Sequence, residues 1–139
     1  MIQPHIDYLA VLVAAVGAWI TGAVWYGVLG KAWLAALGKT KAELMGPSGK
    51  PSPLPFVLSF VADLVIAFVL AGVVGAVGGG KVSVLAGIVT GALMWLGFVV
   101  TTLAVNNAYS GRKTTLTVID AGHWLAALVV AGAIIGAFG

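Results

Sequence analysis

Four long apolar runs alternate with polar segments along the chain, and this pattern predicts four membrane-spanning helices. A helix needs about 20 apolar residues to cross the hydrocarbon core of a bilayer. We therefore expect spanning helices at residues 8–29, 56–77, 82–105 and 116–138. The connections between most of them are short, which favours an up-and-down four-helix bundle. The expected fold is an all-α membrane protein with a single transmembrane domain over residues 1–139.

The longest polar segment, residues 30–55, follows the first apolar run. Its first part, from Lys31 to Met45, mixes apolar residues with lysines, which indicates a short amphipathic helix on the membrane surface. Thr40 and Glu43 fit a capping box for the second half of that helix. Residues 46–55 are rich in glycine and proline and are predicted to form a loop.

The composition supports a membrane location and excludes several classes of function. Hydrophobic residues make up 61% of the chain and charged residues 8%, against roughly 25% charged residues in soluble domains. The absence of cysteine excludes disulfides, thiolate metal sites and a cysteine nucleophile. No basic run of the kind that binds nucleic acid is present. The expected partners are the lipid bilayer and other membrane proteins.

The basic residues predict how the chain is threaded. The connections after the first and third spans hold six basic residues: Lys31, Lys39, Lys41, Lys50, Arg112 and Lys113. The opposite side holds Lys81 alone. The positive-inside rule therefore predicts that both long connections are cytoplasmic and both termini periplasmic, in a bacterial inner membrane. Residues expected at the membrane interface are Trp25, Tyr26, Lys31, Trp33, Arg112 and Lys113.

Polar residues gather in the half of the membrane nearest the basic connections. At about 1.5 Å per residue, Asp63 and His123 lie about 10 Å below that boundary. Asp120 lies one turn nearer the surface, on the same helical face as His123. The predicted intramembrane polar cluster is Thr21, Asp63, Thr101, Thr102, Asn106, Asp120 and His123. We expect Asp63 to pair with His123, and Asp120 to be bound by Arg112, Lys113 or Asn106.

This cluster allows three interpretations. Interhelical polar contacts are ordinary in membrane bundles, so the favoured one is structural. Intramembrane Asp and His also form proton relays and ligand pockets, which is the second. A metal site is the weakest, because Asp120 and His123 supply two ligands and Asp63 alone has the depth for a third. We expect no bound metal, no cofactor and no enzymatic activity.

Small residues recur at spacings that suggest tight helix packing. Three Gly-x-x-x-Gly strips begin at Gly75, Gly87 and Gly132, and one of them could also support self-association. Residues 21–25, Thr-Gly-Ala-Val-Trp, resemble residues 90–95, Thr-Gly-Ala-Leu-Met-Trp, with one residue inserted. Chance matches are common in so biased a composition, so a true duplication is the less favoured interpretation.

Three motifs together resemble a bacterial membrane family known as domain of unknown function 1761. They are Trp25 to Trp33, Asn106 to Lys113, and Ile119 to His123. The resemblance covers nearly the whole chain and implies the four-helix fold and the membrane location, but no activity. An asparagine is usual in that family at the position of Asp120. That difference counts against a family-wide acid–base role.

The sequence therefore predicts a small multi-pass membrane protein with a structural or interaction role, either as a homo-oligomer or as an accessory subunit. The alternative is an oligomeric transporter or channel subunit. In that case Thr21, Asp63, Asp120 and His123 would line a polar cavity in the cytoplasmic half.

Overall fold

The computed structural model describes residues 5–139, which form helices and no strands. Four helical stretches are long and apolar enough to cross a membrane, which confirms the number of predicted spans. The helices are α1 (Tyr8–Leu37), α2 (Lys41–Met45), α3 (Leu54–Val77), α4 (Val84–Met94), η1 (Trp95–Val99), α5 (Val100–Tyr109) and α6 (Thr114–Phe138). The third span is thus α4, η1 and α5 in succession.

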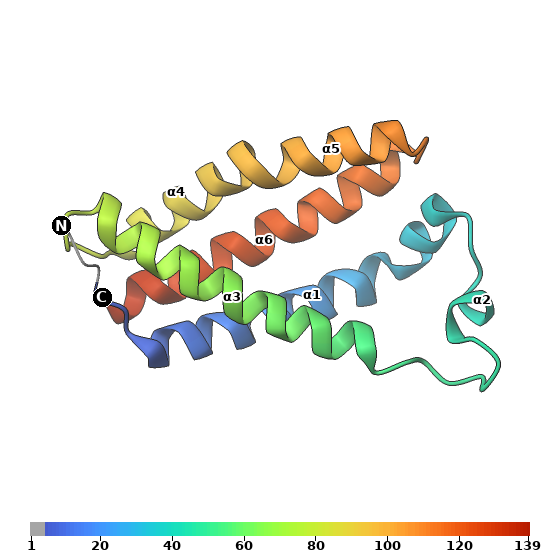
Figure 1. The fold of residues 1–139 in the computed structure, drawn as a ribbon, viewed down its shortest axis with the longest axis horizontal. Helices are drawn as coiled ribbons and strands as arrows, with labels where there is room; N and C mark the ends of the chain where they lie inside the picture. The colour runs from blue at the N-terminus through green and yellow to red at the C-terminus, as the bar shows by residue number, and fades with distance from the viewer. Residues whose placement is uncertain (1–4) are drawn as a thin grey trace.

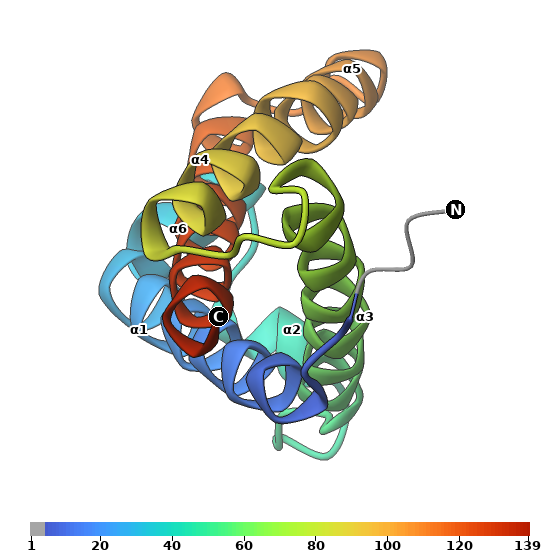
Figure 2. The same cartoon turned by 90° about the vertical axis from the view of Figure 1, so that its left-hand side faces the viewer.

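Helix α6 is the centre of the bundle, with α1 and α4 against it and α3 packed mainly on α1 (Figures 1 and 2). At one end, called here the loop end, α1 and α5 finish and α3 and α6 begin (Figure 1). There α5 and the first half of α3 lie on different sides of α6 (Figure 1). The shared core consists largely of alanine, with Ala14, Ala15, Ala67 and Ala131 almost fully buried. Such small side chains let helix backbones approach closely.

Helix α1 is longer than predicted, because it continues to Leu37 instead of ending near Leu29. Residues 31–37 contain no helix breaker, and the helix stops only at Gly38, whose φ of 75° needs a glycine. The first half of the expected amphipathic helix is therefore a continuation of the first span. The second half is α2, and its capping box between Thr40 and Glu43 is confirmed.

Glycines fasten α4 to α6. A side chain on Gly87 would collide with the carbonyl group of Gly132, and one on Gly132 would collide with that of Gly87. Gly91 faces the carbonyl oxygen of Leu128, at 2.6 Å from where its own Cβ would lie. Gly136 makes a similar contact with the Ser83 carbonyl. The strips beginning at Gly87 and Gly132 are therefore packing surfaces, as predicted, but they are used within the chain.

That internal use corrects the idea that one of the glycine strips supports self-association. The strips beginning at Gly87 and Gly132 face each other across the α4–α6 contact. The strip beginning at Gly75 is interrupted, because Gly75 is buried in α3 while Gly79 lies in the turn after it, with φ of 60°. None of the three strips is therefore free to pack against a second molecule.

A turn of π-helix, η1, interrupts the third span. The backbone N–H of Val100 bonds to the carbonyl of Trp95, five residues earlier. An uninterrupted α-helix that presents Gly87 and Gly91 to α6 would also present Phe98, Thr102 and Val105. Those three are exposed, whereas Val99, Leu103 and Asn107 are half-buried. The π turn thus coincides with a change in which side of the third span faces α6.

Candidate functional site

Three neighbouring positions on α6 receive side-chain hydrogen bonds from the helices on either side. Trp25 of α1 donates its indole N–H to the carbonyl of Ile119, at 3.0 Å. Trp95 of η1 donates to the carbonyl of Ala121, at 2.7 Å. A backbone carbonyl has two lone pairs, so each can accept an indole proton as well as its helical bond. We call the segment Ile119–His123 the α6 hub.

The third bond in this group joins two side chains. The hydroxyl of Tyr26 donates to the Asp120 Oδ1, at 2.6 Å. A bond to a carboxylate is among the stronger hydrogen bonds, and inside a bilayer it also offsets the cost of a buried polar group. The structure therefore corrects the predicted partners of Asp120: Tyr26 takes the place of Arg112, Lys113 and Asn106.

His123 is packed among aromatic rings and a glycine. Its side chain is 8% exposed, and its ring centroid lies 5.1 Å from that of Tyr26 and 4.6 Å from that of Trp124. Gly22 of α1 leaves room for the ring, because a Cβ there would lie 2.9 Å from His123 Nε2. In the reverse direction, Gly122 of α6 leaves room for Trp25, whose ring carbon Cζ2 would lie 2.7 Å from an added Cβ. Each helix thus accepts a ring from the other.

Two buried polar atoms of the interior have no hydrogen-bond partner in the described part of the chain, Asp63 Oδ1 and His123 Nδ1. The prediction that these two residues pair is therefore wrong for those atoms. Asp63 is 4% exposed on α3, so the prediction that it faces inward is correct. Unpaired buried groups of this kind favour binding of a proton, a water molecule or a polar ligand.

The predicted polar cluster is only partly assembled. Thr101, Thr102 and Asn106 are exposed on α5, and both threonine hydroxyls bond to carbonyls of η1, one turn earlier in the same span. Thr21 likewise donates to the carbonyl of Gly17. The turn at η1 accounts for the outward placement on α5, because it changes which side of the third span faces α6.

The polar bond between α5 and α6 is made by Asn107, a residue outside the predicted cluster. The Asn107 amide donates to the Thr117 hydroxyl, at 3.0 Å, and so ties α5 to α6. On the other side of the bundle, the Trp19 indole donates to the Ser59 hydroxyl and joins α1 to α3. Both pairs, like the Trp95 bond, were missed, because sequence spacing does not show which long-range partners meet.

The residues expected at the interface divide into two groups. Lys31, Arg112 and Lys113 are exposed at the loop end. Trp25 and Tyr26 instead bond to the α6 hub, and Trp33 lies edge-on to Tyr26, with ring centroids 5.7 Å apart. The aromatic group therefore connects helices, a role that the interpretation as headgroup anchors did not include.

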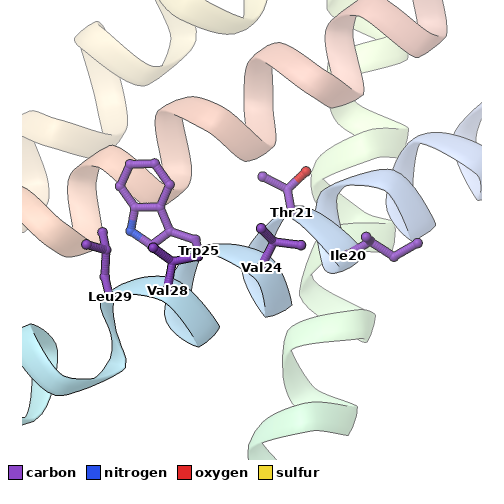
Figure 3. Close-up of a pocket in the computed structure, with 6 residues that line it drawn as sticks. All are labelled: Ile20, Thr21, Val24, Trp25, Val28 and Leu29. Carbon is purple, nitrogen blue, oxygen red and sulfur yellow. The ribbon is translucent and has the colours of Figure 1, made fainter.

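An apolar hollow of about 440 Å³ runs along α1 beside this site (Figure 3). Its lining residues are Ile20, Thr21, Val24, Trp25, Val28 and Leu29. In residues 5–139, no group of three His, Cys, Asp or Glu side chains is arranged to hold a metal ion. The site can therefore donate and accept hydrogen bonds and exchange a proton, and it lies beside a surface suited to apolar chains.

Comparison with known proteins gives one match. No curated protein and no solved structure is significantly similar to this chain. Residues 9–136 match the model of a family described as protein of unknown function DUF1761. The match covers all three motifs that resemble that family and nearly the whole of the four spans. The chain therefore belongs to the DUF1761 family.

Proposed function

We propose that this protein is an interaction module of the bacterial inner membrane that works as a homo-oligomer, with its loop end in the cytoplasm. The orientation rests on the six basic residues at the loop end against Lys81 at the other. The proposal assigns no catalytic step, and the polar hub serves to hold α1, η1 and α6 in register.

The observation that carries the proposal is the outward polar face of α5. Thr101, Thr102 and Asn106 are exposed on a helix whose main neighbours are η1 and α6. The threonine hydroxyls are satisfied within the helix, but an exposed asparagine amide gains more from a protein partner than from lipid. An amide both donates and accepts, so Asn106 of a second copy complements it across a twofold axis.

Cysteine crosslinking tests this interface without background, because the chain has no native cysteine. Asn106→Cys should form a disulfide-linked dimer in membranes, and Ala32→Cys, at an exposed position on α1, is the matched control. Asn106→Leu should reduce the dimer fraction in native mass spectrometry with lipids retained. A monomer under all conditions, or a complex with a different protein alone, would contradict the homo-oligomer.

A transporter or channel subunit is the second candidate, favoured by the unpaired Asp63 Oδ1 and His123 Nδ1. Asp63→Asn and His123→Gln separate the two candidates. Loss of pH-dependent flux in liposomes with the oligomer intact supports transport. A loosened oligomer with no flux in the unmodified protein supports the interaction module.

A further inference from the structure

A second hollow, of about 410 Å³, lies at the loop end between the last residues of α1 and the turn from α5 to α6. The α1 side contributes Ala36, Leu37, Gly38 and Lys39. The turn contributes Ser110, Gly111, Arg112 and Lys113, and α6 contributes Leu116. We call this hollow the basic pocket.

The charges of the basic pocket all have the same sign. Lys39, Arg112 and Lys113 come from two separate parts of the chain, and no acidic residue is among the lining residues. Three cations around one hollow repel each other, so an anion there lowers their mutual repulsion. An Arg beside two lysines suits a phosphate, to which a guanidinium can donate two parallel hydrogen bonds.

The backbone at the start of α6 adds N–H donors to the pocket, and no side chain of the helix cap occupies them. Lys113 is the N-cap of α6, and its side chain does not cap the helix. The first backbone N–H groups of a helix have no acceptors within it and favour negative charge. The hydroxyl of Ser110 donates to the Asn106 carbonyl, so that carbonyl needs no donor from the pocket.

An apolar surface lies within reach of the pocket on the same helix. Ala36 and Leu37 line the basic pocket, and Leu29 ends the apolar hollow described above. Ala36 comes seven positions after Leu29, which is about 10 Å along α1. A molecule with an anionic head and a long apolar chain therefore matches the two hollows together.

We propose that the basic pocket binds the phosphate of an anionic phospholipid, with an acyl chain along the hollow on α1. Basic pockets between spans on the cytoplasmic side are typical sites for anionic headgroups. Thr101, Thr102 and Asn106, which form the proposed α5 interface, are not among the residues that line this site, although Ser110 of the lining bonds to the Asn106 carbonyl.

Binding of short-chain lipids to the purified protein tests the proposal by native mass spectrometry. Dioctanoyl phosphatidylglycerol should bind more tightly than dioctanoyl phosphatidylcholine. The triple variant Lys39→Ala, Arg112→Ala, Lys113→Ala should lose that preference. Each removed cation is expected to weaken binding about fivefold. The matched control is Lys31→Ala, Lys41→Ala, Lys50→Ala, which removes the same charge at the same end and leaves the pocket intact.

Each result decides between the pocket and its alternatives. Loss in the pocket variant with retention in the control supports the proposal. Equal loss in both variants means diffuse attraction to a basic surface and overturns it, as does no loss in either. Full displacement of the lipid by millimolar inorganic phosphate overturns it in favour of a free phosphate site. If the triple variant does not fold, Arg112→Ala against Lys50→Ala repeats the test with an expected fivefold difference.

Discussion

Residues 21–25 of α1 and residues 90–95 of the third span have similar sequences and similar positions beside α6, but they contact it differently. Gly22 makes room for a side chain, the ring of His123. Gly91 makes room for backbone, the carbonyl of Leu128. Each segment ends in a tryptophan that donates to an α6 carbonyl, at Ile119 or Ala121. In both helices, a short run of small residues and one indole thus lies against α6.

The two segments differ most in the residue that comes after the tryptophan. In α1 this residue is Tyr26, which bonds to Asp120, and the helix continues without interruption. In the third span it is Leu96, which is 57% exposed and lies in the π turn. The second segment has one more residue than the first between its threonine and its tryptophan. A helix with one residue in excess can absorb it as a π turn.

Deleting Met94 gives the second segment the length of the first and tests the largest difference between the two, the π turn. We expect η1 to become α-helical and α5 to keep the same face toward α6, because the deletion removes the one residue that the π turn absorbs. Cysteines placed singly at Thr102 and Asn107 report the face with maleimide labelling. The exposed position 102 should label faster than position 107 both in the native chain and after the deletion. A reversed order after the deletion would show that the π turn does not absorb the extra residue.

The next largest effect is the difference in stability loss between alanine substitutions at Gly91 and at Gly22. Gly91→Ala should lower the free energy of unfolding by about 3 kcal/mol, because the new methyl group meets backbone that cannot yield. Gly22→Ala should cost about 1 kcal/mol, because the His123 ring can shift. Detergent-titration unfolding measures both. Equal losses would mean that the two contacts are equally rigid. His123→Ala should remove the penalty of Gly22→Ala and leave that of Gly91→Ala unchanged.

The Tyr26–Asp120 bond, which the second segment lacks, comes third. Tyr26→Phe should destabilise the protein by about 1.5 kcal/mol, since it leaves a carboxylate without its donor. In a double-mutant cycle with Asp120→Ala, which removes the acceptor, the two losses should not add. Leu96→Ala is the control at the corresponding place in the third span. Additive losses for Tyr26 and Asp120 would contradict a direct bond.

The smallest effects are expected from the two indole bonds. Trp25→Phe and Trp95→Phe should each cost about 0.6 kcal/mol from the lost bond, beyond the smaller ring, because each carbonyl also accepts within α6. Similar losses would support the equivalence of the two segments, and a loss at only one position would contradict it. Trp33→Phe, whose indole bonds to no described residue of α6, is the control for ring size.

The sequence was a good guide to the features that depend on length and hydrophobicity. Four apolar runs predicted four spans because the bilayer sets the length of a helix. The capping box at Thr40 and the glycines at 87 and 132 were also identifiable, since their effects are local or depend on side-chain size. The end of α1 was misplaced by eight residues, from Leu29 to Leu37, because the change to polar composition came before the first helix breaker.

The candidate site was less predictable, for a geometric reason. Depth along a helix follows from counting residues, and Asp63 and His123 do lie inside the bundle. The side that a residue faces depends on every turn before it, so one π turn was enough to misplace Thr101, Thr102 and Asn106. The Tyr26–Asp120 bond joins residues 94 positions apart, and nothing in either local sequence specifies that distance.

The hydrogen bonds on the α6 hub also determine which parts of the molecule can move. Trp25 and Trp95 bond to α6 carbonyls two residues apart from different neighbouring helices, and Gly87 and Gly91 bring the α4 backbone into contact with α6. Rotation or sliding of α6 would have to break both sets of contacts. Helices α1, α4 and α6 therefore form the rigid part of the bundle. Helix α5 has far fewer contacts with α6 than α1 and α4 have, so it is the part of the bundle that can move at the lowest free-energy cost.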